Sequence, residues 1–234
     1  MESIGQSLGL AAEDWTALAL TLRLCLYTTI ILMIFATPLA WWLANGRSLS
    51  RTAVQAVVAL PLVLPPTVLG FYLLIALGPR GMIGGTMETL GFQHFAFTFE
   101  GILIGSVIYS MPFAVQPLEN AFSSLGKRPV EVAASLGAGA MDRFFSVIVP
   151  MARRGFLVAI TLTFAHTMGE FGVVLMVGGN IPGVTHVLST TIYGYTESMQ
   201  YAAAGRLSLL LLIGAFVVLF LVYWLNRSFE MARP

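Results

Sequence analysis

Two side chains that could do chemistry, His166 and Glu170, stand four residues apart in an otherwise apolar run. On a helix this spacing places both side chains on one face, within pairing distance. An ionisable residue inside an apolar span is costly to keep, so it indicates a functional role. A metal site needs three or more ligands, and the sequence offers no second cluster to complete one. We therefore interpret Glu170 as part of a structural or gating ion pair, neutralised by His166, Arg23 or a partner subunit.

The composition indicates that the elements holding these residues lie in a membrane. The 234 residues are 57% hydrophobic and 10% charged, with a mean hydropathy of +0.85, whereas a soluble domain carries about 25% charged residues. The net charge of +1 excludes the strongly basic balance of a nucleic-acid binder. A single cysteine, Cys25, excludes an intrachain disulfide. The first residues carry acids and no base, so we expect no cleaved signal peptide.

Five stretches are apolar over about the 20 residues that a helix needs to cross a bilayer. They are residues 15–43, 53–77, 101–122, 155–178 and 206–225. Pro61, Pro65 and Pro66 must break or kink the second, which a membrane tolerates only beside other protein or a cavity. Residues 180–205 are too polar to favour a sixth span. We expect an all-α polytopic membrane bundle of five helices, or six with that segment, in one domain over residues 1–234.

Basic residues predict the orientation of these spans, because loops rich in Lys and Arg stay in the cytoplasm. Arg80 and Arg206 lie on one side of the predicted bundle, and Arg23 lies within a span. The rest of the 12 Lys and Arg residues lie on the other side: Arg47, Arg51, Lys127, Arg128, Arg143, Arg153, Arg154, Arg227 and Arg233. The N-terminus is therefore expected outside and the C-terminus in the cytoplasm.

The stretch VEVAASLGAGAMDRFFSVIVP, residues 130–150, is short and amphipathic and falls on the cytoplasmic side. Pro129 suits the first position of a helix, and Glu131 complements the positive end of that helix. Gly137 and Gly139 can end it. These features predict one short helix in the loop, followed by a second element.

The second half of this stretch predicts another helix and a surface for close contact. Asp142 can begin a helix that runs to Pro150. The small residues Ala133, Ala134 and Gly137 would let another backbone approach closely. The residues alone leave two interpretations open, an alanine-rich interfacial helix or a docking surface for another protein.

The order E-V-A-A-S-L-G, nine residues and V-I-V-P resembles the EAA motif of permease subunits from ATP-binding cassette importers. That motif reads EAA, three residues, Gly, nine residues and I-x-L-P. Val132, Val147 and Val149 depart from it conservatively. The resemblance implies that residues 127–154 form coupling helices that dock on a separate ATPase subunit. The residues it assigns to coupling are Glu131, Ala133, Ala134, Gly137, Ala138, Gly139 and Pro150.

Further stretches are similar to the molybdate-transport permease family. They are LPLVLPPTVLGFYLLIALGPRGMIG at residues 60–84, HTMGEFGVVLMVGGNIPGVTHVLSTTIY at residues 166–193, and SLGAGAMDRFFSVIVP within the loop above. The resemblance covers residues 15 to 225, and sulfate and thiosulfate permease subunits share the proline-rich span and the GEFG pattern. It implies the type I ABC importer permease fold in the cytoplasmic (inner) membrane of a prokaryote.

A tetrahedral dianion that crosses a membrane must exchange its water for other donors without being trapped. Hydroxyls and peptide N–H groups at broken helices suit this better than fixed cations. The candidates for the pathway or its gate are Pro65, Pro66, Thr67, Ser110, Thr163, Thr167 and Glu170. Each hydroxyl can instead bond a carbonyl of its own helix. A bare carboxylate would repel an anion, so we do not expect Glu170 to bind it directly.

Energy for transport must come from elsewhere, because the chain has no GxxxxGK[ST] loop to hold ATP. The resemblance implies two ATPase subunits that carry ATP and Mg, a second copy of this chain, and a periplasmic or extracellular molybdate-binding protein. Arg80 is the candidate contact for that binding protein. We expect no cofactor, metal or nucleic acid on this chain, and lipid around it. The expected function is import of molybdate by alternating access, without bond chemistry in this chain.

Other interpretations remain open. The same role for sulfate, thiosulfate or tungstate changes only the anion, since these dianions share shape and charge. An ion-driven anion carrier or a channel should show inverted repeats or several intramembrane acids, and we find neither. A membrane metalloprotease should carry HExxH, which is absent.

Overall fold

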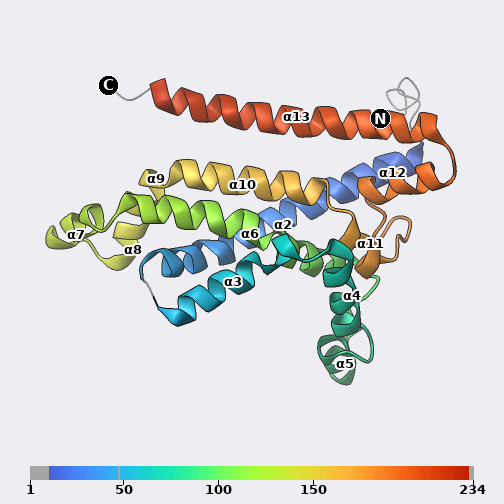
Figure 1. The fold of residues 1–234 in the computed structure, drawn as a ribbon, viewed down its shortest axis with the longest axis horizontal. Helices are drawn as coiled ribbons and strands as arrows, with labels where there is room; N and C mark the ends of the chain where they lie inside the picture. The colour runs from blue at the N-terminus through green and yellow to red at the C-terminus, as the bar shows by residue number, and fades with distance from the viewer. Residues whose placement is uncertain (1–10, 47, 232–234) are drawn as a thin grey trace.

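A computed structural model describes residues 11–46 and 48–231 of the chain (Figure 1). In this part of the chain every regular element is helical, which confirms the predicted fold class. Arg47 and Arg233, two of the basic residues on which the predicted orientation rests, lie outside the described residues. The elements are α2 (Ala12–Ala44), α3 (Leu49–Val63), α4 (Pro66–Leu77), α5 (Met82–Thr89), α6 (Phe99–Leu125), α7 (Arg128–Ser135), α8 (Ala140–Arg143), the π-helical η1 (Phe144–Ile148), α9 (Val149–Met151), α10 (Arg153–Met168), α11 (Gly172–Gly178), α12 (Leu188–Glu197) and α13 (Tyr201–Met231).

Within the described residues, four helical segments are long and apolar enough to cross a membrane, and a bent pair makes a fifth. The four are Ala12–Ala44, Pro66–Thr89, Phe99–Leu125 and Tyr201–Trp224; the pair is Ala140–Met151 with Arg153–Met168, bent by 73°. Five spans result if the pair counts as one. In residues 180–205 the ten-residue α12 is too short to cross.

The predicted break in the second apolar stretch is confirmed, and it lies between α3 and α4. Pro65 and Pro66 have no N–H to continue the helix, and Leu64, directly before them, is extended with ψ 135°. Pro61 lies inside α3 without ending it. The shorter α4 then leaves the direction of the long helices (Figure 1).

The fourth apolar stretch, residues 155–178, is not one continuous span, so this prediction was wrong. The helix α10 ends where the N–H of Gly169 bonds back to the carbonyl of Ala165, at 3.3 Å. Phe171, with φ −124° and ψ −56°, turns the chain into the short α11. Ser189 on α12 donates to the Glu170 carbonyl at 2.6 Å, so the break keeps a buried partner, as a membrane interior requires.

Helices α2, α6 and α10 form the centre of the bundle and pack extensively on one another (Figure 1). Small side chains lie at their contacts, including the buried Ala36, Ala40 and Ala114, and such residues let membrane helices approach closely. Thr21 and Thr29 in α2 each donate to the carbonyl one turn earlier, at 2.7 Å. Their hydroxyls are therefore satisfied inside an apolar core.

The long α13 lies along one side of this core and contacts α10 and α12 (Figure 1). Most of its apolar side chains are exposed, among them Leu212 and Phe216, which are 67% and 66% exposed. A helix this apolar and this exposed suits a lipid environment. The core and the site described next are built by the other helices.

Candidate functional site

The two helix breaks meet in space. The helices α4 and α11 start beside each other, because a Cβ added to Gly172 would lie 2.6 Å from the Cβ of Pro66. One turn further on, a Cβ added to Gly70 would lie 2.7 Å from the Cβ of Met176. Glycine at these two positions allows a contact that any side chain would prevent.

The same two helices also end beside each other, against the loop before α6. The N–H groups of Phe95 and Ala96 each donate to the carbonyl of Leu77, the last residue of α4, at 3.2 Å. The N–H of Phe97 donates to the carbonyl of Val177 in α11 at 2.9 Å. The two half-helices therefore run parallel, with both N-terminal ends at the breaks.

A cavity of about 510 Å³ lies where the half-helices begin. It is lined by Pro66, Thr67, Tyr109, Ala165, His166, Gly169, Glu170, Phe171 and Gly172. Three of the predicted pathway residues, Pro66, Thr67 and Glu170, thus lie on its wall. Pro65 directly precedes them as the N-cap of α4.

Two further predicted pathway hydroxyls, those of Ser110 and Thr167, lie behind the cavity in a hydrogen-bonded contact between α6 and α10. The Ser110 hydroxyl is 3.0 Å from His166 Nδ1 and 3.0 Å from Thr167 Oγ1. Thr167 also donates to the carbonyl of Thr163 at 2.9 Å, the local bond that was the alternative interpretation. The His166 ring stacks on Phe113, with 4.0 Å between ring centroids. Ser110 and Thr167 therefore hold His166 in place on the cavity wall.

Among the residues it describes, the structure shows no contact that would give the Thr163 side chain a role in the pathway. It is fully buried in α10, and its Oγ1 has no hydrogen-bond partner among the described residues. It does not line the cavity.

The ion pair predicted for Glu170 does not form with His166 or Arg23 in the part of the chain that the structure describes. Both carboxylate oxygens are buried without a hydrogen-bond partner among the described residues. His166 bonds Ser110 instead. The guanidinium of Arg23 lies over the rings of Phe99 and Tyr27, 4.5 Å and 5.4 Å from their centroids. Neutralisation by a partner subunit stays a hypothesis, and no group of three His, Cys, Asp or Glu that could hold a metal occurs in the described part of the chain.

Sequence reasoning missed two residues of the cavity wall, Tyr109 and Phe171. His166 was considered as a partner for Glu170 and as a metal ligand, but not as part of the pathway. The hydrophobic pattern gave no signal for Tyr109, because its place on the wall depends on how α6 packs against α10.

The predicted coupling loop lies at the opposite end of the bundle from α12 (Figure 1). Its first helix, α7, has Pro129 in the first turn, as predicted. It ends in a backbone cap, in which the N–H of Gly137 donates to the Ala134 carbonyl and the N–H of Ala138 to the Ala133 carbonyl, both at 3.0 Å. Gly137 has φ +87°, a left-handed conformation that favours glycine at this cap.

The second part of the loop differs from the prediction. Helix α8 begins at Ala140, two residues before Asp142, and the Asp142 carboxylate accepts from the Ser146 hydroxyl at 2.8 Å. A π-helical turn, η1, then leads into Pro150. A proline ring clashes with the carbonyl four residues earlier in a regular helix, and the wider π turn relieves that clash.

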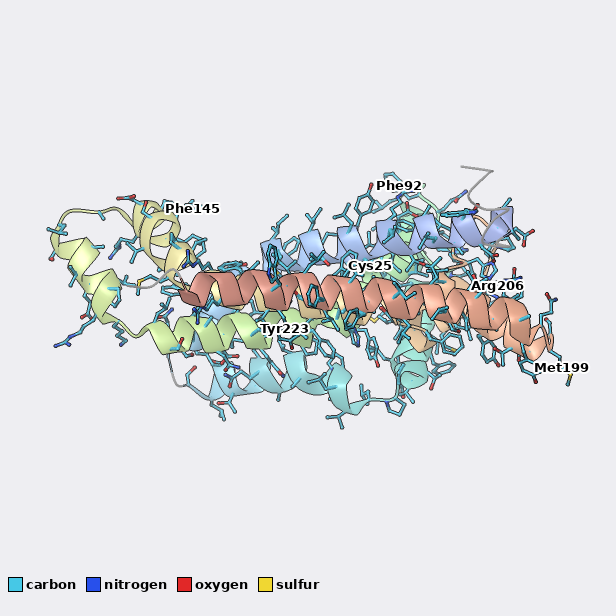
Figure 2. All side chains as sticks on the ribbon, turned by 90° about the horizontal axis from the view of Figure 1, so that it is seen from above. Cys25, Phe92, Phe145, Met199, Arg206 and Tyr223 are labelled. Atoms are coloured by element: carbon cyan, nitrogen blue, oxygen red, sulfur yellow. The ribbon has the colours of Figure 1, made fainter. Side chains whose placement is uncertain are left out.

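The loop presents its predicted coupling residues to the outside of the molecule. Those residues are exposed or half-buried: Glu131, Ala133, Ala134, Gly137, Ala138, Gly139 and Pro150. Larger apolar side chains beside them, which the sequence analysis did not single out, are also exposed, notably Leu136 at 82% and Met141 at 73%. Apolar side chains gathered on an exposed surface mark a contact with another protein or with the membrane, so both interpretations of this stretch stay open at this point. Figure 2 shows Phe145 at this end and Met199 at the other.

These features define a class of protein before any comparison: a multi-pass helical membrane protein with broken helices around a partly polar cavity. Residues 36–231 match the family described as binding-protein-dependent transport system inner membrane component. The chain belongs to this family.

Within this family, the chain is similar to permease proteins of molybdenum and sulfate transport systems. The molybdenum transport system permease protein ModB of Azotobacter vinelandii is 53% identical over 218 residues, which cover 93% of this chain and 96% of the relative. ModB of Escherichia coli K12 is 30% identical, with the same coverage of each chain. A probable sulfate transport system permease protein, cysT of Helicosporidium, is 34% identical over 88% of this chain and 76% of its own length.

Solved structures confirm the fold. A bacterial ABC transporter involved in the import of the acidic polysaccharide alginate matches with a TM-score of 0.70 and 18% identity, over 97% of this chain and 82% of that chain. The MetNI methionine ABC transporter in inward-facing conformations matches with a TM-score of 0.66 and 19% identity, over 92% and 95%. The bundle described above therefore has the fold of ABC importer membrane subunits.

Proposed function

We propose that this chain is the permease subunit of an ATP-driven importer that moves molybdate across the cytoplasmic membrane. The observation that carries the proposal is the 53% identity with a molybdenum transport permease over nearly the whole of both chains. The exposed loop at one end and the cavity between broken helices support it. Sulfate, thiosulfate or tungstate would use the same mechanism.

The geometry supports a mechanical link between the loop and the cavity. Helix α10 begins at Arg153, directly after the coupling loop, and ends at Met168, beside the cavity residues His166 and Gly169. A displacement of the loop by a docked ATPase would therefore move one wall of the cavity. Alternating access follows if α10 forms different contacts with the half-helices α4 and α11 in two conformations, one open to each side of the membrane, and if the ATP cycle switches between them.

The proposed assembly has two copies of this chain, two ATPase subunits and a delivered molybdate-binding protein. ATP and Mg would bind to the ATPase subunits, and this chain would bind no cofactor. The exposed Arg80, in the turn between α4 and α5, lies at the end away from the loop and is the proposed contact for the binding protein. This arrangement has the N-terminus outside and the C-terminus in the cytoplasm.

A matched pair of glycines in the coupling loop tests the role of the loop. A Cβ at either Gly137 or Gly139 would meet no atom within 4 Å, but only Gly137 has a positive φ, +87°. A left-handed conformation costs a residue with a side chain about 1–2 kcal/mol. We expect Gly137→Ala to reduce binding-protein-stimulated ATP hydrolysis by about tenfold through a distorted docking surface. We expect Gly139→Ala to reduce it less, because the backbone at Gly139 needs no left-handed conformation.

The measurement is made on the chain co-purified with its ATPase and reconstituted in liposomes, with a binding protein loaded with molybdate, tungstate or sulfate. Stimulation by molybdate alone identifies the anion, and stimulation by sulfate would reassign it. The ion-driven carrier or channel is favoured if the chain without ATPase takes up the anion. Full stimulation in both glycine variants would contradict the assignment of these residues to the docking surface, and equal loss would show that the left-handed conformation of Gly137 is not what matters.

A further inference from the structure

Glu170 is a buried ionisable residue to which the proposed transport mechanism assigns no role. Its side chain is 4% exposed, and both Oε atoms lack a hydrogen-bond partner among the described residues. Its backbone, in contrast, is held on both sides. The N–H donates to the Thr167 carbonyl at 3.3 Å, and the carbonyl accepts from the Ser189 hydroxyl at 2.6 Å. The side chain therefore sits in a fixed place with nothing to compensate a negative charge.

The neighbouring elements bring no cation to Glu170: on α10, Arg153 and Arg154 lie in the first turn, and Glu170 follows the last turn at the other end of the helix. Helices α4 and α11 contain no Asp, Glu, Lys, Arg or His. On α10, His166 gives its Nδ1 to Ser110 and its ring face to Phe113. On α2, Arg23 lies over the aromatic rings described above. An unpaired carboxylate taken out of water has lost its hydration without a replacement, whereas a neutral carboxylic acid loses far less.

A hydroxyl without a partner lies next to this acid. Ser106, on α6, is fully buried and its Oγ has no hydrogen-bond partner among the described residues. It faces the Glu170 carboxyl without meeting the geometry of a hydrogen bond. A carboxylic acid can donate one hydrogen bond and accept others, so a small adjustment would satisfy both groups.

We propose that Glu170 is a positioning residue that holds its proton, and that the neutral acid ties the α10–α11 break to α6 through the hydroxyl of Ser106. The acid then fixes the segment Gly169–Phe171, which forms part of the cavity wall. It does so without placing a negative charge beside the path of an anion. This assignment replaces the gating ion pair within the chain, and it rests on the proposed function only for its readout in transport.

Loss of the proton would leave an uncompensated charge at this contact. The contact between the α10–α11 break and α6 should therefore become less stable as the pH rises. Among the titratable groups of the packed elements, Tyr109 of α6 and His166 of α10 share the cavity wall with Glu170, and Cys25 of α2 is fully buried. On α12, Tyr193 and Tyr195 each have their hydroxyl bonded elsewhere, to Glu197 and Asp14. None of these groups is a cation that would hold Glu170 ionised.

The test compares E170Q, E170A and S106A in the reconstituted complex of permease, ATPase and binding protein. Glutamine keeps the shape and an N–H donor but cannot ionise, so we expect E170Q to retain uptake within about twofold of the unchanged chain. Alanine removes the contact, so we expect E170A to lower uptake by about tenfold, and S106A to lower it less. Uptake by the unchanged chain should fall at alkaline pH, and uptake by E170Q should not.

Infrared spectroscopy of the purified full chain tests the proton directly and needs no transport. We expect the carbonyl band of a protonated carboxylic acid in the unchanged chain and its loss in E170Q. Size-exclusion profiles and melting temperatures check that E170A is folded. The proposal is overturned if E170Q loses as much uptake as E170A or if the band is absent, since either result means that Glu170 acts as an anion. Absence of uptake by the unchanged chain would contradict the proposed function, while the infrared band would still decide this inference.

Discussion

The Ser110 hydroxyl joins α6 to two residues of α10, one of which, His166, lies on the cavity wall. One hydroxyl on α6 contacts both His166 Nδ1 and Thr167 Oγ1 on α10. Inside a bundle such bonds are hard to replace, because no water is available to satisfy the groups that lose a partner. The position of the imidazole on the wall therefore depends on a residue that does not itself line the cavity.

Replacing Ser110 by alanine tests this dependence. Ser110→Ala leaves the His166 imidazole and the Thr167 hydroxyl without their shared partner, which should cost about 1–3 kcal/mol and lower the melting temperature by several degrees. The matched control is Ser124→Ala, because Ser124 is exposed and donates only to the Ala121 carbonyl in its own helix. Thermal unfolding of both variants in detergent is the measurement, and equal shifts would contradict the role given to Ser110.

At the scale of elements, the site depends on how closely α4 and α11 approach each other. Neither half-helix carries an ionisable group other than Tyr72, so packing holds them together. Gly172 lies against Pro66 at the cavity, and Gly105 of α6 lies against Val173, where an added Cβ would come within 2.8 Å of a Val173 methyl. The cavity thus keeps its shape through contacts that leave no room for a methyl group.

Adding that methyl group is the second test. Gly172→Ala would place a Cβ 2.6 Å from Pro66 Cβ, and such overpacking costs about 1–3 kcal/mol. Gly214→Ala in α13 is the control, since its Cβ would meet nothing within 4 Å and alanine favours a helix by about 1 kcal/mol. We expect a lower melting temperature and lower uptake for Gly172→Ala, and an unchanged or raised melting temperature for Gly214→Ala. If Gly172→Ala behaves like the control, the two half-helices do not depend on this contact.

The two breaks also show how far the sequence could predict the site. Pro65 and Pro66 predict the first break, because two consecutive residues without N–H groups cannot continue a helix. The second break gives no such signal: Gly169 and Glu170 interrupt a run that remains apolar on both sides. The contact of Ser110 with His166 depends on the register between α6 and α10, which no local pattern encodes. Element types were predictable, and the pairing of side chains between elements was not.

For the whole molecule, the long helices are longer than a membrane is thick. The 33 residues of α2 span about 50 Å at 1.5 Å per residue, against a hydrocarbon core of about 30 Å. The ends of the bundle therefore extend into the headgroups or the solvent. One end carries α7 and α8, with Lys127 and Arg128; the other carries α12, while α5 projects sideways from that half of the bundle (Figure 1). The excess of basic residues at the first end predicts that it faces the cytoplasm.

Labelling with a membrane-impermeant maleimide tests this orientation. The native cysteine, Cys25, is fully buried, so the unchanged chain should not react and provides the control. Leu136, in the coupling loop, and Met199, at the opposite end, are 82% and 76% exposed, and each can be replaced by cysteine. With the chain expressed without its ATPase, we expect Met199→Cys to react in intact cells and Leu136→Cys to react only after the membrane is permeabilised. The reverse pattern would place the loop outside the cell, where no ATPase could reach it, and the proposed coupling would then be excluded.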